Sequence, residues 1–97
     1  MREPLKIDET VSLRLGRGIR LKHDTGRGAW TLQAPERVVV LDEIAHAVIS
    51  EIVDSDGGLG GVIDRLSQSF EAPRDEIAAD VIEMLQGFVD KQLLQLK

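Results

Sequence analysis

The spacing of the apolar residues changes at Asp42, and this change limits the fold more than any other feature of the sequence. Before Asp42, apolar and polar residues alternate in short stretches, which is typical of half-buried β-strands. After Asp42, apolar residues recur every three or four positions, which is typical of amphipathic helices. Strands followed by helices in a chain of 97 residues predict one α+β domain, in which a small three-stranded antiparallel sheet precedes a bundle of three helices.

Turn residues divide the first part of the chain into strands. The alternation occurs at residues 11–15, 19–24 and 30–33, with a Thr-Gly-Arg-Gly turn signal before the last of these. After Pro35 comes the run Arg37–Leu41, which is rich in β-branched residues and does not alternate. Either both faces of this run are covered, or one face is open for a partner. We expect three short strands in a meander, with this run as the last strand and therefore at an edge.

Two helices are predicted between Asp42 and the next proline. Asp42 is an N-cap residue, and the apolar spacing after it predicts a helix that ends near Asp54. The segment 55–61 has four glycines, and we expect a flexible hinge there that leaves self-association by exchange of elements open. A short second helix follows at 62–70 and is broken by Pro73.

The third predicted helix opens with Arg74-Asp75-Glu76, which places acidic residues in its first turn. On a helical wheel, the apolar residues between Ile77 and Gln92 fill an arc of roughly 160°, whereas an ordinary surface helix needs about 100°. The extra apolar edge is expected to pack on a further element or on a partner.

We expect a flexible N-terminal arm at residues 1–10 and a single domain at residues 11–97. The arm has no hydrophobic period, and it lacks the apolar stretch of a secretory signal. No apolar run in the sequence approaches the about 18 residues that a membrane helix needs. These features predict a cytoplasmic protein that does not contact membranes.

Few residues in the chain suit catalysis or metal binding. The sequence has no cysteine and only two histidines, His23 and His46. Glu43 and His46 have the i, i+3 spacing of ligands in some helical bundles, but such sites need a second pair, which is missing. We therefore expect no enzyme, no metal and no cofactor.

The charge is uneven along the chain, whose formal net charge is -5. Residues 1–37 carry eight Lys/Arg and five Asp/Glu, whereas residues 38–97 carry four and twelve. Nucleic-acid binding depends on cations that meet phosphates, so this balance predicts no nucleic-acid partner. The layout nevertheless leaves a winged-helix DNA-binding regulator as the alternative function. The acidic third helix opposes that alternative.

Residues 18–94, about four-fifths of the chain, closely resemble the PqqD family of pyrroloquinoline quinone (PQQ) biosynthesis. The residues that carry the resemblance are Gly18-Ile19-Arg20-Leu21, Asp24-x-x-Arg27-Gly28-Ala29-Trp30-x-Leu32, Ala34-Pro35-Glu36-Arg37-Val38-Val39-Val40-Leu41-Asp42-Glu43-x-Ala45 and Ile77-x-x-Asp80-Val81-x-x-x-Leu85-x-x-Phe88-x-Asp90-Lys91-x-Leu93-Leu94. The chain departs from the family at Asp42, where Asn is usual, and at the glycine-rich loop, where a Ser or Thr cap is usual.

The resemblance implies a winged-helix-like fold and a non-catalytic activity. Members of the family bind the ribosomally made precursor peptide PqqA and present it to the radical S-adenosylmethionine enzyme PqqE. Related domains take their peptide as an extra strand beside the third strand, over a groove walled by the last helix. A small enzyme that modifies the peptide is a third alternative, which the shortage of catalytic residues opposes.

Strand addition at the predicted edge supplies the candidate site, because backbone hydrogen bonds give such a complex affinity and side-chain pockets give it specificity. The expected peptide-binding residues are Arg37, Val38, Val39, Val40 and Leu41 on the strand and Ile77, Val81, Leu85 and Phe88 on the last helix.

Overall fold

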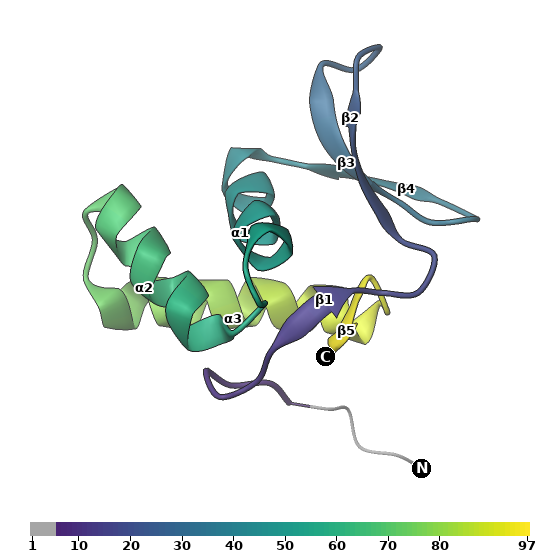
Figure 1. The fold of residues 1–97 in the computed structure, drawn as a ribbon. Helices are drawn as coiled ribbons and strands as arrows, with labels where there is room; N and C mark the ends of the chain where they lie inside the picture. The colour runs from purple at the N-terminus through teal and green to yellow at the C-terminus, as the bar shows by residue number, and fades with distance from the viewer. Residues whose placement is uncertain (1–5) are drawn as a thin grey trace.

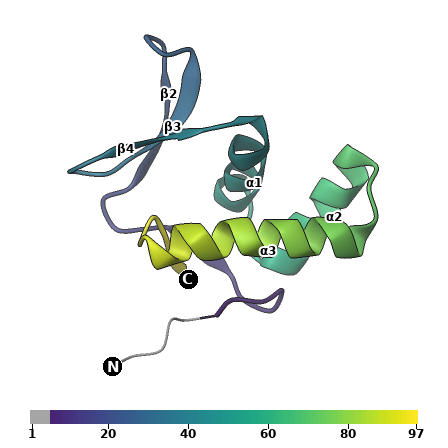
Figure 2. The ribbon, with the colours of Figure 1, turned by 180° about the vertical axis from the view of Figure 1, so that it is seen from behind.

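The computed structural model describes residues 6–97 and confirms the predicted α+β class. In chain order the elements are β1 (Leu13–Leu15), β2 (Arg20–Asp24), β3 (Ala29–Gln33), β4 (Val38–Leu41), α1 (Glu43–Asp54), α2 (Leu59–Phe70), α3 (Arg74–Asp90) and β5 (Leu94–Leu96). Figures 1 and 2 show α1 between the sheet of β2, β3 and β4 on one side and α3 on the other. None of the described helices is long and apolar enough to cross a bilayer.

The three-stranded sheet is an antiparallel meander with the order β2-β3-β4. Trp30 on β3 faces His23 on β2 and Leu41 on β4. The β2–β3 turn includes Gly28, whose φ of +66° suits a residue without a Cβ. As predicted, β4 has only one neighbouring strand and forms an edge of this sheet.

The first alternating segment does not join this meander. Its residues Leu13–Leu15 pair antiparallel with Leu94–Leu96 near the C-terminus, which makes a separate two-stranded sheet. The prediction that the last helix extends to Gln92 is also wrong. Helix α3 ends at Asp90, and Gln92 adopts the left-handed conformation with φ of 62°, which turns the chain back. Leu94 can then bury its side chain between the helices and β1.

Helix α1 begins and ends where the sequence predicted. The carboxylate of Asp42 accepts a hydrogen bond of 2.7 Å from the amide of Ala45, so it satisfies one of the amides left free at the first turn. The helix ends at Asp54. Its buried side chains, Val48, Ile49 and Ile52 among them, lie in the centre of the core.

The glycine-rich segment is a tight connection and not the expected hinge. Helix α2 already begins at Leu59, so only residues 55–58 link it to α1. Gly57 has a φ of +83° and accepts a hydrogen bond from the amide of Leu13, and a Cβ on Gly57 would overlap the carbonyl oxygen of Leu13. The glycine permits close approach of β1, which fixes the segment in place.

Residues 6–10 of the predicted flexible arm pack against the helices, and residues 1–5 lie outside the described part of the chain. Ile7 is buried, and the carboxylate of Glu9 lies 2.6 Å from the guanidinium of Arg74. Arg74 also contacts Asp64 on α2 at 2.5 Å. Glu9 and Asp64 raise the pKa of Arg74 above its ordinary value by accepting its hydrogen bonds.

Candidate functional site

The open edge of β4 presents unpaired backbone groups. The amide of Ala34 donates to the carbonyl of Arg37 at 2.9 Å, which makes these two residues a hydrogen-bonded pair of the β3–β4 ladder. Bonded and non-bonded pairs alternate along antiparallel strands, so Val39 and Leu41 are bonded to β3 as well. The amide and carbonyl groups of Val38 and Val40 therefore point away from the sheet.

The side chains of β4 divide between the two faces of the sheet. Val39 and Leu41 face the core, with Leu41 only 5% exposed. Val38 and Val40 lie on the opposite face and are about half exposed, at 45% and 51%. An edge strand with no charged side chain and two exposed valines lacks the usual protection against pairing with another strand.

An apolar groove of about 240 Å³ lies between the three helices, close to the end of β4. It is lined by Ile44, Val48, Leu66, Phe70, Ile77, Asp80, Val81 and Met84. Ile44 follows the last residue of β4 by three positions, and its side chain is 57% exposed. The β4 edge and this groove together offer backbone partners and an apolar surface for one extended ligand.

The predicted residues of the last helix are divided between the groove and the core. Ile77 and Val81 line the groove. Leu85 is fully buried, and Phe88 is partly buried against the core. On the strand side, Leu41 is also a core residue. Val81, although it lines the groove, is also only 5% exposed. The structure therefore leaves Ile77 and the open edge of β4 as the predicted parts best placed to meet a ligand, with Val81 at the floor of the groove.

Arg37 lies at the start of the edge strand but points its guanidinium toward α3. Its Nη2 donates a hydrogen bond of 2.7 Å to the carbonyl oxygen of Lys91, the residue after the last turn of α3. This contact joins the β3–β4 turn to the C-terminal end of α3. Arg37 thus places a cation beside the first residue of the edge strand.

Six groove residues were absent from the predicted site: Ile44, Val48, Leu66, Phe70, Asp80 and Met84. Met84 belongs to the wide apolar arc of the last helix, so its position on the wheel was a signal for it. Ile44 and Phe70 occupy ordinary apolar positions in the periodic pattern of their helices. Periodicity places a residue on the apolar face but does not show that the neighbouring helices leave that part of the face open.

Both histidines contact the single tryptophan. The ring of His46 on α1 stacks on that of Trp30 with centroids 4.5 Å apart and planes at 9°, and His23 on β2 lies 5.1 Å away at 59°. This stack fastens β3 to the first helix. His46 is therefore a packing partner of the sheet. Among residues 6–97 no group of three or more His, Cys, Asp or Glu side chains could hold a metal ion.

Comparison with known proteins finds one family on most of the chain. The family model described as coenzyme PQQ synthesis protein D (PqqD) matches residues 29–94. Curated relatives include a PqqA binding protein of Xanthomonas oryzae pv. oryzae, 44% identical over 79 residues, which are 81% of this chain and 85% of the relative. A PqqA binding protein of Bradyrhizobium diazoefficiens is 39% identical over 90 residues, which are 93% of this chain and 86% of the relative.

Two solved structures share the fold. The solution NMR structure of the PqqD truncation of Methylobacterium extorquens PqqCD has a TM-score of 0.80 and 35% identity, and it covers 97% of this chain and 99% of its own. That truncation is described as a functional, stand-alone recognition element for ribosomally synthesized and post-translationally modified peptides (RiPPs). The crystal structure of PqqD from Xanthomonas campestris has a TM-score of 0.54 and 42% identity, covering 86% and 91%.

Proposed function

Because this chain belongs to the PqqD family of PQQ biosynthesis, we propose that it is a recognition element that binds the precursor peptide PqqA by adding it as a strand to β4. In this proposal the chain acts in the cytoplasm and is not itself a catalyst. It presents the bound peptide to the radical S-adenosylmethionine enzyme PqqE. The names of its relatives support PqqA as the ligand, and the resemblance of the sequence to the family suggests PqqE as the second partner.

The open edge of β4 is the observation that carries this proposal. Val38 and Val40 each direct one amide and one carbonyl away from β3. A peptide strand would bond to these groups whatever its side chains are, so the edge supplies affinity without reading much of the sequence. Selectivity for one peptide must therefore come from the surfaces beside the edge.

The groove beside the end of β4 suits apolar side chains of the peptide. Ile44 and Phe70 are exposed at its rim, whereas Ile77 and Val81 form part of its wall. Burying apolar surface is worth about 25 cal/mol per Å², so two apolar side chains of the peptide would contribute a large share of the binding free energy. We propose that this groove, and not the buried Leu85, is what the last helix offers to PqqA.

Replacing Val40 with proline tests strand addition directly. The amide of Val40 points away from β3, so the proline removes a bond to the peptide and none inside the sheet. We expect Val40→Pro to weaken PqqA binding about tenfold or more, since an unpaired peptide carbonyl is costly. The matched control Val40→Ala keeps the amide and should bind nearly as well as the parent chain.

Titration of isotope-labelled protein with synthetic PqqA measures this effect. Saturable amide shifts should centre on Val38–Leu41 and on Ile77 and Val81, and the only tryptophan, Trp30 beside Leu41, adds a fluorescence signal. Equal affinity of the proline and alanine variants would reject strand addition at β4. Cross-linking of PqqA by PqqE should then be faster with the parent chain than with Val40→Pro, and equal rates would reject presentation.

The alternative of a DNA-binding regulator gains no support from the charges. The exposed side chains of α3 include Asp75, Glu76, Asp80 and Glu83, so the helix in the position of a recognition helix would repel phosphates.

A further inference from the structure

We propose that the basic trough at the start of β4 is a subsite for one carboxylate side chain of the bound peptide and sets the register of the added strand. The basic trough is the pair of adjoining hollows around Arg17 and Gln92 at the C-terminal end of α3. This inference rests on the proposed function, because it assumes that a peptide strand occupies the β4 edge.

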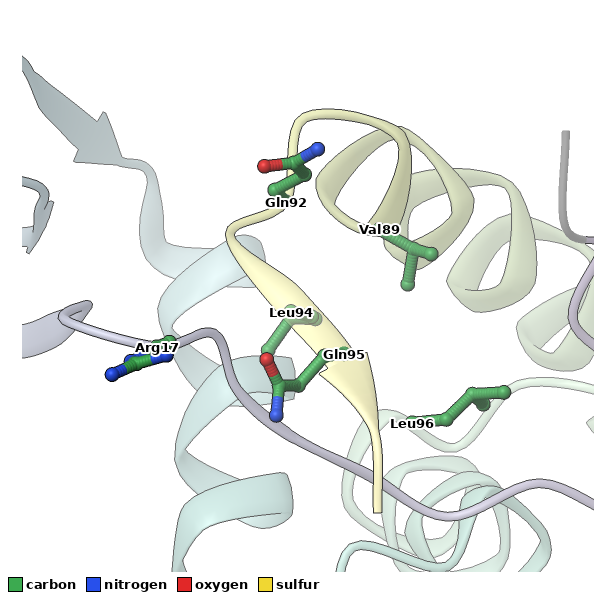
Figure 3. Close-up of a pocket in the computed structure, with 6 residues that line it drawn as sticks. All are labelled: Arg17, Val89, Gln92, Leu94, Gln95 and Leu96. Carbon is green, nitrogen blue, oxygen red and sulfur yellow. The ribbon is translucent and has the colours of Figure 1, made fainter.

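Two hollows meet at this end of the molecule. One, of about 290 Å³, is lined by Arg17, Ile19, Ala34, Pro35, Glu36, Arg37, Lys91 and Gln92. The other, of about 400 Å³, is lined by Arg17, Val89, Gln92, Leu94, Gln95 and Leu96. Figure 3 shows this second hollow, with Arg17 on the chain leading to β2, Gln92 at the turn after α3 and Gln95 on β5. Arg17 and Gln92 line both, so the two hollows adjoin.

The trough has an excess of positive charge. Three cationic side chains line it, Arg17, Arg37 and Lys91, against the single carboxylate of Glu36. Within residues 6–97 the side chains of Arg17 and Lys91 form no hydrogen bond or ion pair, and Arg37 bonds only to a backbone carbonyl. Asp90, the nearest acid on α3, lines a different hollow beside Gln86 and accepts a hydrogen bond from it.

The trough lies directly in line with the open edge. Arg37 immediately precedes Val38, the first residue of β4. Residues in a strand advance by about 3.3 Å each, so a peptide residue one or two positions beyond the partner of Val38 reaches the trough. A carboxylate there would receive charge-assisted hydrogen bonds, which are stronger than neutral ones.

An added strand needs such an anchor, because the edge itself hardly distinguishes one register from another. Val38, Val39 and Val40 are identical side chains, and a shift by one residue would turn every peptide side chain to the opposite face. A peptide whose apolar residues lie by Ile44 and whose carboxylate lies by Arg17 has only one register that satisfies both ends. The net charge of -5 disfavours a carboxylate ligand over the chain as a whole, so the local cations of the trough also direct it.

The test combines charge variants of the whole protein with charge variants of the peptide. Affinity for synthetic PqqA is measured for the parent chain, Arg17→Gln and Lys91→Gln. Each Asp and Glu of the peptide is then changed singly to Asn or Gln. We expect Arg17→Gln or Lys91→Gln to weaken binding of the unchanged peptide about three- to tenfold, with a smaller effect of salt on affinity. One of the peptide variants should bind the parent chain more weakly by the same factor. That peptide should bind Arg17→Gln or Lys91→Gln no more weakly than the unchanged peptide does.

Arg27→Gln is the matched control, since it removes the same charge at the β2–β3 turn, which lies far from α3 (Figure 1). It should leave PqqA affinity unchanged. If the parent chain binds PqqA and neither trough variant differs from it, or if every peptide variant loses equally on all proteins, the subsite is rejected while strand addition stands. A parent chain that binds no PqqA rejects both proposals.

Discussion

At the scale of single residues, the backbone of Gly57 matters more to this fold than the flexibility of the segment that contains it. Its positive φ lets the chain turn from α1 into α2 while its carbonyl accepts the amide of Leu13. No side chain fits between Gly57 and β1. The four glycines of the segment therefore have different roles, and Gly60 and Gly61 are ordinary residues of a helix.

Gly57→Ala should destabilise the protein by about 2 kcal/mol or more, because the left-handed conformation is strained for alanine and its Cβ would push β1 away. Gly87→Ala is the matched control, since Gly87 lies within α3 and a Cβ there meets nothing within 4 Å. That change should stabilise the protein by about 0.5–1 kcal/mol. Urea unfolding of both variants measures the difference, and an unchanged midpoint for Gly57→Ala would contradict this account of the connection.

Asp42 links the edge strand to the helix that supports it. Asp42→Ala should cost about 1 kcal/mol of unfolding free energy, because the amide of Ala45 loses its acceptor. Asp42→Asn keeps an acceptor oxygen and should cost much less. Thermal unfolding of the two variants separates them, and equal losses would mean that the charge of Asp42 matters and its capping hydrogen bond does not.

At the scale of elements, β4 is hydrogen-bonded to β3 along one edge and open along the other. In the free protein, the amides of Val38 and Val40 should exchange with solvent quickly, whereas those of Val39 and Leu41 are bonded to β3 and should exchange slowly. Addition of PqqA should slow the exchange of Val38 and Val40. Hydrogen exchange followed by NMR resolves the four amides, and equal protection of all four in the free protein would mean that the edge is already covered.

The groove between the helices supplies a second prediction at this scale. Ile44→Gln should weaken PqqA binding severalfold and change stability little, because Ile44 is 57% exposed and lines the groove. Val53→Gln is the control on the same helix, since Val53 is 45% exposed and nine residues away, on the opposite side of α1. Calorimetric titration of both variants with PqqA measures the two affinities, and equal values would exclude the groove from the binding surface.

These elements also show how far local patterns determine the fold. The β4 edge, the cap at Asp42 and the end of α1 at Asp54 were predictable, because each depends on neighbouring residues. Strand β5 was not, because it forms only by pairing with β1, which lies about 80 residues earlier in the chain. The groove depends on how three helices pack, so periodicity identified Ile77 and Val81 but not Phe70.

At the scale of the whole molecule, the two sheets are joined through one core. The β1–β5 pair brings together the two ends of the described chain, and its residues Leu13 and Leu94 are buried together with residues of α1 and β3. Figure 1 nevertheless shows the sheet of β2, β3 and β4 projecting upward from the helices, above β1 and β5. A change at β5 therefore tests whether the projecting sheet unfolds together with the rest.

Leu94→Ala should cost about 2–5 kcal/mol, since it removes a side chain that is 1% exposed and leaves a cavity. Because both sheets share the core, Trp30 fluorescence in the distant sheet and helical circular dichroism should shift to lower urea by the same amount. Leu96→Ala is the matched control, with a side chain 39% exposed and an expected cost well below 2 kcal/mol. A fluorescence transition that stays in place while the dichroism moves would show that the β4 edge is carried on a separately unfolding unit.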